Sequence, residues 1–235
     1  MAPSVDEPPF HGLDPDTLVC PRWPNPAKCP PLNAFTTTRQ THWSQADAFT
    51  SAHWLRQVHG TRVISLDAWQ PGIEADGAWT DRVGAVAAIQ TADCLPIFLT
   101  GHAPAFVAVA HAGWRGLAAG MVASAVAACP GVPGDMQAWI GPAISQNNYE
   151  VDEVVYRALM AGQPPVGEYF QPSRRGHWWA DLAGIAVWQL HQAGVPEVAV
   201  SGECTAQAPE KYWSYRARSQ ETDMTERMIS LIWLA

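Results

Sequence analysis

The chain has 235 residues, 48% of them hydrophobic and 15% charged, which excludes a disordered protein and is enough to bury a substantial core. The formal net charge is -8 and there is no run of Lys or Arg, which argues against a nucleic-acid groove or an anionic membrane surface as partner. The five cysteines show no paired spacing and no basic-then-apolar leader occurs, so we expect reduced thiols and a cytoplasmic protein.

In chain order, residues 1–31 are rich in proline and predict an arm along the surface, with Trp23 anchored in a hydrophobic groove. Apolar runs then predict strands at residues 34–38, 62–66, 75–79, 85–91, 97–100, 106–110, 137–140, 197–200 and 228–233. Helices are expected at residues 117–129, 152–160 and 182–193. The last helix has Asp181 as a plausible N-cap and Gly194 just beyond its end.

The stretch 162–176 is rich in Gly and Pro and predicts a long surface loop. No second core of adequate size follows it, so we expect one domain spanning residues 1–235. Strands and helices do not alternate strictly, which disfavours a simple doubly wound parallel sheet. The longest apolar stretch, 105–129, is interrupted by His111 and Arg115. Its uninterrupted part, 117–129, is well short of the roughly 20 residues needed to span a bilayer.

The hexapeptide HAGWRG at residues 111–116 is the most informative turn of the chain. It joins a predicted buried strand to a small-residue segment that predicts a helix, the place where α/β proteins bind ligands. Backbone N–H groups at such a turn can face an anion, and Arg115 adds a permanent, fork-shaped cation.

Two further segments, QVHG at 57–60 and TADCLP at 91–96, each place a candidate ligand near the end of a predicted strand. His59, Cys94 and His111 are too far apart in sequence for a zinc finger, whose ligands come in close pairs. Two imidazoles and a thiolate form the three-ligand set of a catalytic zinc site with an open fourth position. Blue-copper sites use the same ligands, so Cu²⁺ is an alternative metal.

These motifs carry a resemblance to a known family. Together with WIGPAI at 139–144, and with shorter matches at 37–39, 149–151, 204–205, 214–216 and 230–234, the chain resembles the laccase-domain family over nearly its whole length. Members have been called multicopper polyphenol oxidases, peptidoglycan-editing factors and purine nucleoside phosphorylases. In that family the histidine of QVHG, the cysteine of ADC and the histidine of HAGWRG bind zinc. Here those positions are His59, Cys94 and His111.

The resemblance implies an α+β fold of two mixed β-sheets packed together and flanked by helices (α/β/β/α). It also implies zinc-dependent phosphorolysis of adenosine, inosine and methylthioadenosine, with adenosine deaminase as a side activity. The expected partners are a purine nucleoside and phosphate, in a monomer or small homo-oligomer.

Within that reaction, Cys94, His111 and Asp93 are the candidate catalytic residues, with Asp93 as a proton relay beside Cys94 or, equally, a cap of the local turn. The candidate substrate contacts are Arg39, Arg115 and Arg216, since guanidinium groups match phosphate geometry.

Three alternatives stay open at this stage. A copper-dependent polyphenol oxidase would need further metal centres, and the chain has no His-x-His pair to build them. Cys94 could instead act as a nucleophile with His111 as its base, in an amidase that edits peptidoglycan precursors. The non-enzyme alternative is an interaction module stabilised by zinc.

The chain departs from the family at two places. Between Arg39 and Gln57 it lacks the Gly-Gly-Val-Ser, Asn-Leu-Gly and Asn-Arg elements that in the family usually follow the Thr-Thr-Arg motif, here residues 37–39. Residues 221–227 replace the usual Thr-Gly-Arg turn. The metal ligands are intact, so the shortened segment bears on the substrate pocket and not on metal binding.

Overall fold

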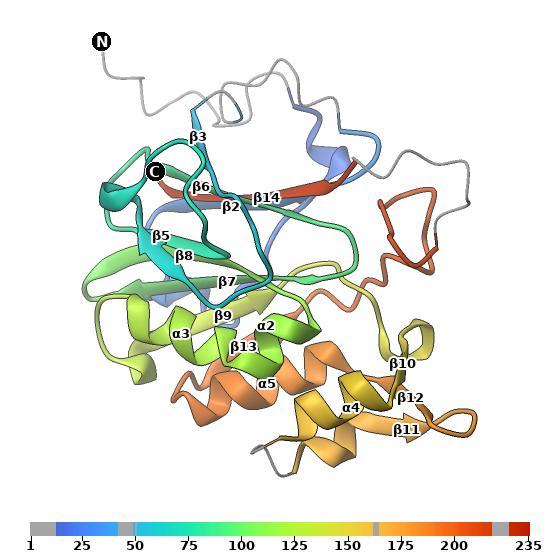
Figure 1. Cartoon of the computed structure of the whole chain (residues 1–235). Coiled ribbons are helices and arrows are strands. Elements are labelled where there is room, and N and C mark those ends of the chain that lie inside the picture. The colour runs from blue at the N-terminus through green and yellow to red at the C-terminus, as the bar shows by residue number, and fades with distance from the viewer. Residues whose placement is uncertain (1–12, 42–48, 50, 162–164, 218–225) are drawn as a thin grey trace.

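Two large mixed β-sheets pack face to face in the computed structural model, which describes residues 13–41, 49, 51–161, 165–217 and 226–235 (Figure 1). The five-stranded sheet has the order β1 (Leu18–Val19), β2 (Leu32–Thr37), β14 (Met228–Leu234), β6 (Val86–Thr91) and β3 (Ala52–Trp54). β3 runs parallel to β6, and the other neighbours are antiparallel.

The six-stranded sheet has the order β13 (Glu197–Val200), β9 (Met136–Ile140), β7 (Leu95–His102), β8 (Ala105–Ala112), β5 (Gly77–Thr80) and β4 (Val63–Ser65). Its outer pairs, β13 with β9 and β4 with β5, are parallel, while β7 pairs antiparallel with both β8 and β9. The expected α+β fold with two packed mixed sheets is therefore confirmed.

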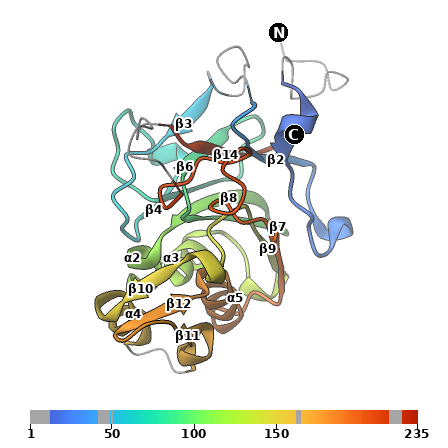
Figure 2. The same ribbon diagram turned by 90° about the vertical axis from the view of Figure 1, so that its right-hand side faces the viewer.

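The helices α2 (Trp114–Ala119), α3 (Met121–Ala128) and α5 (Leu182–Gln192) cover the outer face of the six-stranded sheet (Figure 1). α4 (Glu153–Met160) lies beside α2 and next to a small antiparallel sheet of β10 (Glu150–Asp152), β12 (His177–Ala180) and β11 (Phe170–Pro172), which Figure 2 shows at the base of the molecule. Short 3-10 helices occupy Pro15–Thr17, Pro26–Lys28, Leu66–Ala68, Pro133–Asp135, Gln146–Asn148 and Val166–Tyr169.

The central strands are apolar on both faces because both faces are buried. In β7, Leu95, Ile97 and Leu99 point toward the helices, whereas Phe98 points into the space between the two sheets. There Phe98 packs in one cluster with Trp139 of β9, and their ring centroids are 5.2 Å apart. Because the strands are buried on both faces, their ends are fixed in position, and the candidate ligands lie near those ends.

Three local features differ from the expectations. The predicted helix 117–129 is two helices, because Gly120 adopts φ 94, a left-handed conformation that ends α2. The predicted loop 162–176 contains a 3-10 helix and strand β11. Strands β1, β3, β10 and β12 were not anticipated, being only two to four residues long. Such short strands carry little periodic signal.

The amino-terminal arm is described from Leu13 onward, and residues 1–12 lie outside the described part. Leu13 is buried in a cluster on the outer face of the five-stranded sheet, with Phe35 and Trp233. Trp23 is half-buried against the cluster between the sheets, as expected for an anchor. In the shortened segment between Arg39 and Gln57, residues 42–48 and 50 lie outside the described residues, as do residues 221–225 of the other departure.

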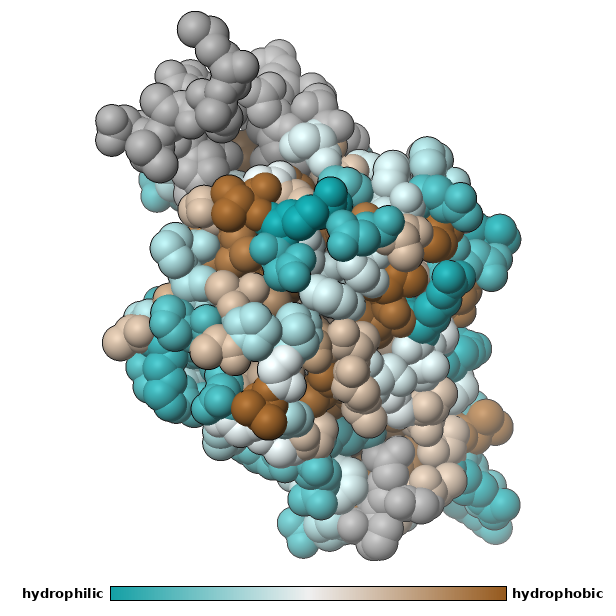
Figure 3. All heavy atoms as spheres, turned by 90° about the vertical axis from the view of Figure 1, so that its left-hand side faces the viewer, coloured by the Kyte–Doolittle hydropathy of each residue, from teal (hydrophilic) through white to brown (hydrophobic). Residues whose placement is uncertain are grey.

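The surface gives two further observations. On the face seen in Figure 3, hydrophobic side chains form separate groups between hydrophilic ones. Among the described residues, no helix combines the length and the apolar character that crossing a bilayer requires.

Candidate metal-binding active site

The three candidate ligands converge although they are distant in sequence. His59 lies in the loop between β3 and β4, Cys94 in the turn between β6 and β7, and His111 near the end of β8. One donor atom from each lies within 4.8 Å of the others, and the two imidazole centroids are 4.7 Å apart. The cluster therefore joins the two large sheets, because β6 belongs to one and β7 and β8 to the other.

Two backbone conformations around the cluster are strained. His59 has φ 58 and Asp93 has φ 83, values that residues with side chains seldom adopt. Asp93 is held there by distant partners: Oδ1 accepts a hydrogen bond of 2.5 Å from the Thr205 hydroxyl, and Oδ2 one of 2.7 Å from the Arg216 backbone N–H. These contacts tie the turn that presents Cys94 to the carboxyl-terminal segment. We expected that, if Asp93 acted as a cap, it would cap its own turn; its carboxylate instead binds the distant Thr205 and Arg216.

A fourth residue, Asp76, organises two of the three ligands, and our sequence reasoning missed it. Its side chain is fully buried. Oδ1 lies 2.8 Å from His111 Nδ1 and accepts a hydrogen bond of 2.9 Å from the His59 backbone N–H. Oδ2 accepts from the backbone N–H groups of Val58 and Gly60, at 3.2 and 2.7 Å. A charged residue inside the predicted strand 75–79 was the available signal, since strands buried on both faces seldom carry one.

The contact with Asp76 fixes the role of each nitrogen of His111. With Nδ1 engaged by the carboxylate, Nε2 is the nitrogen free to face the cluster. This carboxylate–histidine arrangement is the usual support of a histidine that binds a metal.

The electrostatics of the cluster favour a thiolate. Burial by itself disfavours the charged imidazole of His111, but hydrogen bonds to Asp76 and Cys94 outweigh it and raise the pKa of His111 to about 9. Burial also disfavours the Cys94 thiolate, yet hydrogen bonds from His111 and His59 lower the pKa of Cys94 to about 7. A thiolate is the form of cysteine that binds metals.

The donor set fits a zinc ion. Ligand atoms on one tetrahedral zinc lie roughly 3.3 to 3.6 Å apart for bond lengths of about 2.0 to 2.3 Å. The three donors need only small movements from their present separations to reach that geometry. Gly113 makes room for the cluster, because a Cβ there would lie 2.8 Å from Cys94 Sγ and 3.3 Å from His59 Cδ2.

The cluster lines a cavity of about 660 Å³, a size suited to a small-molecule ligand. Three arginines and three aromatic residues are among its other lining residues, which are Arg115, Arg216, Arg227, Trp114, Tyr149, Tyr215, Leu55, Gln57, Gln90, Thr91, Ala92, Asp93 and Gly113. Arginines and aromatic rings around a group of metal ligands can bind an anion and a planar ring at the same time.

Two of the three predicted substrate arginines reach this cavity. The Arg115 guanidinium lies over the Trp114 ring, 4.4 Å from its centroid. The Arg216 guanidinium donates to the Glu150 carbonyl at 3.0 Å and lies 5.1 Å from the Tyr149 ring centroid.

Arg39 instead lines an adjoining cavity of about 540 Å³, which shares Gln90 and Arg227 with the first. Its guanidinium is 3.9 Å from the Trp213 ring centroid and donates to the Pro209 carbonyl at 2.7 Å.

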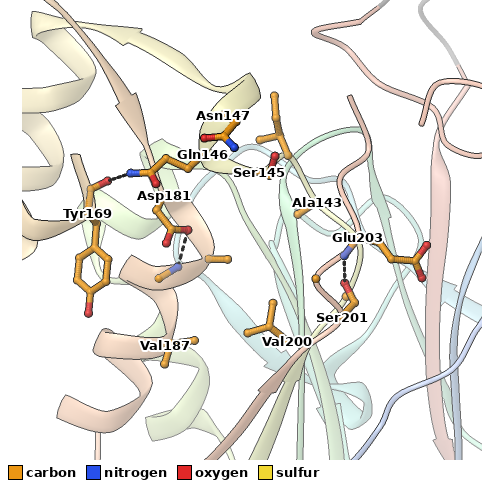
Figure 4. Close-up of a pocket in the computed structure, with 15 residues that line it drawn as sticks. Ala143, Ser145, Gln146, Asn147, Tyr169, Asp181, Val187, Val200, Ser201 and Glu203 are labelled. Atoms are coloured by element: carbon orange, nitrogen blue, oxygen red, sulfur yellow. Dashed lines mark hydrogen bonds between the residues drawn. The ribbon is translucent and has the colours of Figure 1, made fainter. Parts of the chain in front are cut away.

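A further cavity, of about 460 Å³, lies near the start of α5 and is shown in Figure 4. Its polar groups satisfy one another: Asp181 caps the Gly184 N–H, and the Ser201 hydroxyl accepts from the Glu203 N–H. The Glu203 carboxylate is bound by Lys211 and Tyr212. Among the described residues, the candidate metal-ligand group lines the cavity around Cys94 and not this one.

Known proteins are similar to this chain over most of its length. Residues 33–235 match the family model described as multi-copper polyphenol oxidoreductase laccase. A Xylella fastidiosa protein named purine nucleoside phosphorylase is 40% identical over 190 residues, covering 77% of this chain and 72% of the relative. A Pseudomonas aeruginosa protein with the same designation is 36% identical over 245 residues, covering 92% and 98%.

Solved structures share the fold. A crystal structure of a Neisseria meningitidis protein matches with a TM-score of 0.82 at 30% identity, covering 93% of this chain and 99% of that one. A Bacillus licheniformis protein matches with a TM-score of 0.77 at 25% identity, covering 87% and 93%.

Proposed function

The chain belongs to the multi-copper polyphenol oxidoreductase laccase family, and from this premise we propose that it is a zinc-dependent purine nucleoside phosphorylase. The proposed substrates are phosphate with adenosine, inosine or methylthioadenosine. Relatives named purine nucleoside phosphorylase support the reaction class. The observation that carries the proposal is the His59, Cys94 and His111 cluster in a cavity that also contains Arg115 and Arg216.

In this reaction a phosphate oxygen forms a bond to C1′ of the sugar and the C1′–N9 bond breaks, leaving its electron pair on the purine. Arg115 and Arg216 would hold phosphate, because a guanidinium matches the geometry of its oxygens. Trp114 and Tyr215 offer rings on which a purine can stack. Asp93 would keep the turn that contains Cys94 in position. It would also relay protons beside Cys94.

His59, Cys94 and His111 would hold the zinc ion, with Cu²⁺ as a substitute. When bound, zinc supplies Lewis acidity toward an oxygen atom and stabilises negative charge. Asp76 orients His111 for this task. Arg39 would contact substrate only through the adjoining cavity. A water molecule admitted beside bound adenosine would account for an adenosine deaminase side activity.

The test is release of base from the three nucleosides by protein whose metal content has been measured. We expect release that depends on both phosphate and bound zinc, with ribose 1-phosphate as the sugar product for inosine. Base release that does not respond to phosphate would overturn the phosphorylase assignment. The polyphenol oxidase alternative would be favoured if the copper-loaded protein consumed oxygen with a phenol but released no base.

The same preparations also test the alternative in which Cys94 is the nucleophile of a peptidoglycan-editing amidase. A thiolate bound to a metal is a poor free nucleophile, so an amidase should work best without metal. Hydrolysis of a peptidoglycan precursor that increases on chelation would therefore favour that alternative.

A further inference from the structure

Tyr149 lines the cavity that contains His59, Cys94 and His111, and its backbone is held by hydrogen bonds. It follows the 3-10 helix Gln146–Asn148, and its backbone N–H donates to the Gln146 carbonyl at 3.1 Å. Its own carbonyl accepts from the Ala180 N–H of β12 at 3.0 Å. The Arg216 guanidinium lies beside the ring. Backbone and ring are thus fixed, while the hydroxyl makes no hydrogen bond within the described part of the chain.

Other polar side chains of the cavity are already hydrogen-bonded or are buried. The Asp93 carboxylate accepts from Thr205 and from the Arg216 N–H. The Gln57 side-chain amide donates to the Gln90 carbonyl and accepts from the Gln90 N–H, both at 2.8 Å. The Thr91 hydroxyl is buried from solvent. These groups already have a structural task or cannot be reached.

The second tyrosine of the cavity, Tyr215, is 55% exposed, so water competes for its hydroxyl. Tyr149 is more buried. Burial raises the pKa of the Tyr149 hydroxyl above its ordinary value. Tyr149 therefore keeps its proton at neutral pH and is available as a hydrogen-bond donor.

We propose that Tyr149 donates a hydrogen bond to the purine as it leaves the sugar, an inference that rests on the proposed phosphorylase function. When the C1′–N9 bond breaks, its electron pair places negative charge on the purine ring. An O–H donor aimed at a purine nitrogen stabilises that charge more in the transition state than in the substrate. Tyr149 retains its proton, and the released base takes one from solvent, so the step balances.

The test compares Tyr149→Phe with the unaltered protein on inosine and on 7-methylinosine. The methylated base already carries a positive charge, so it leaves without net negative charge and needs no donor. We expect kcat for inosine to fall about 100-fold, the effect of losing one such donor, and kcat for 7-methylinosine to change less than about threefold. Zinc content should be unchanged. Tyr156→Phe is the matched control, since that ring stacks on Trp178, 4.3 Å away, and does not line the cavity.

Equal losses of kcat on both nucleosides would overturn the inference and show that Tyr149 only shapes the cavity. No loss on either nucleoside would overturn it too. These outcomes leave the phosphorylase function intact, because the unaltered protein still releases base with phosphate. Absence of phosphate-dependent release in the unaltered protein is the separate result that removes the proposed function, and the inference with it.

Discussion

His111 Nδ1 and Asp76 Oδ1 lie 2.8 Å apart, and both side chains are buried. The same carboxylate accepts hydrogen bonds from three consecutive backbone N–H groups, Val58 to Gly60. Asp76, the residue just before β5, therefore sets the ring orientation of one candidate metal ligand and the loop conformation of another. The burial of Asp76 is compensated by these contacts: desolvation opposes the charge, but the bonds from His111, Gly60 and Val58 lower the pKa of its carboxyl.

The first prediction concerns this carboxylate. Asp76→Asn keeps the shape but removes the charge, so His111 loses its charged acceptor and the His59 loop loses part of its support. We expect zinc affinity to fall by about 10- to 100-fold, as for other second-sphere partners of metal-binding histidines. Competition with a chromophoric chelator measures it.

The matched control for Asp76→Asn is Asp67→Asn, which removes a carboxylate that pairs with Arg82 at the surface. Zinc affinity in this control should equal that of the unaltered protein. Unchanged affinity in folded Asp76→Asn would show that the histidine is oriented by packing and not by the carboxylate.

The second prediction concerns the space that Gly113 leaves. In Gly113→Ala the new methyl group would lie 2.8 Å from Cys94 Sγ, so the thiol must move away from the two histidines. We expect zinc occupancy to fall sharply, as measured by elemental analysis after dialysis against metal-free buffer. Gly134→Ala is the control, because a Cβ at Gly134 meets no atom within 4 Å. Equal zinc occupancy in both variants would mean that the cluster tolerates displacement of Cys94.

Much of this site could be predicted from the sequence. His59, Cys94 and His111 were reached from their positions near strand ends, and the structure brings them together. That inference worked because apolar runs define strands well, and strand ends are where loops carry chemistry. The two packed sheets were expected from the family resemblance. Individual long strands such as β7 and β8 could be read directly from hydrophobicity.

Other parts could not be predicted, for physical reasons. The contacts of Asp93 with Thr205 and Arg216 join residues more than a hundred positions apart, and no local pattern encodes such pairing. Arg39 looked equivalent to Arg115 in sequence, but stacking on Trp213 holds it in another cavity. The small sheet of β10, β12 and β11 depends on tertiary packing, including the stacking of Tyr156 on Trp178, and not on strand propensity.

The third prediction concerns the thiolate. Cys94→Ser replaces a soft ligand by a hydroxyl that binds zinc poorly, so we expect most of the zinc to be lost. Added zinc should also raise the melting temperature of the variant less than that of the unaltered protein, because binding to the folded state stabilises it by mass action. Cys20→Ser, at an exposed thiol, should keep its zinc. Full zinc retention in Cys94→Ser would contradict the assignment of Cys94 as a zinc ligand.

The last prediction concerns Arg115, which stands in the cavity with its guanidinium over Trp114. If it holds phosphate, Arg115→Ala should raise KM for phosphate about 10-fold or more and KM for the nucleoside much less, since one charge-assisted contact contributes on the order of 1.5 to 3 kcal/mol. Arg115→Lys should restore only part of the loss, because an ammonium group cannot bind two oxygens in the fork geometry of a guanidinium. Steady-state kinetics with phosphate and inosine varied separately measure both constants.

Arg39→Ala serves as the comparison for Arg115→Ala, since Arg39 carries the same charge but lines the adjoining cavity. It should raise KM for phosphate less than Arg115→Ala does. Zinc content should be equal in all three variants, which separates a phosphate contact from damage to the metal cluster. An unchanged phosphate dependence in Arg115→Ala would return Arg115 to a structural role on the Trp114 ring, and Arg216 and Arg227 would then be the arginines of this cavity to test next as phosphate contacts.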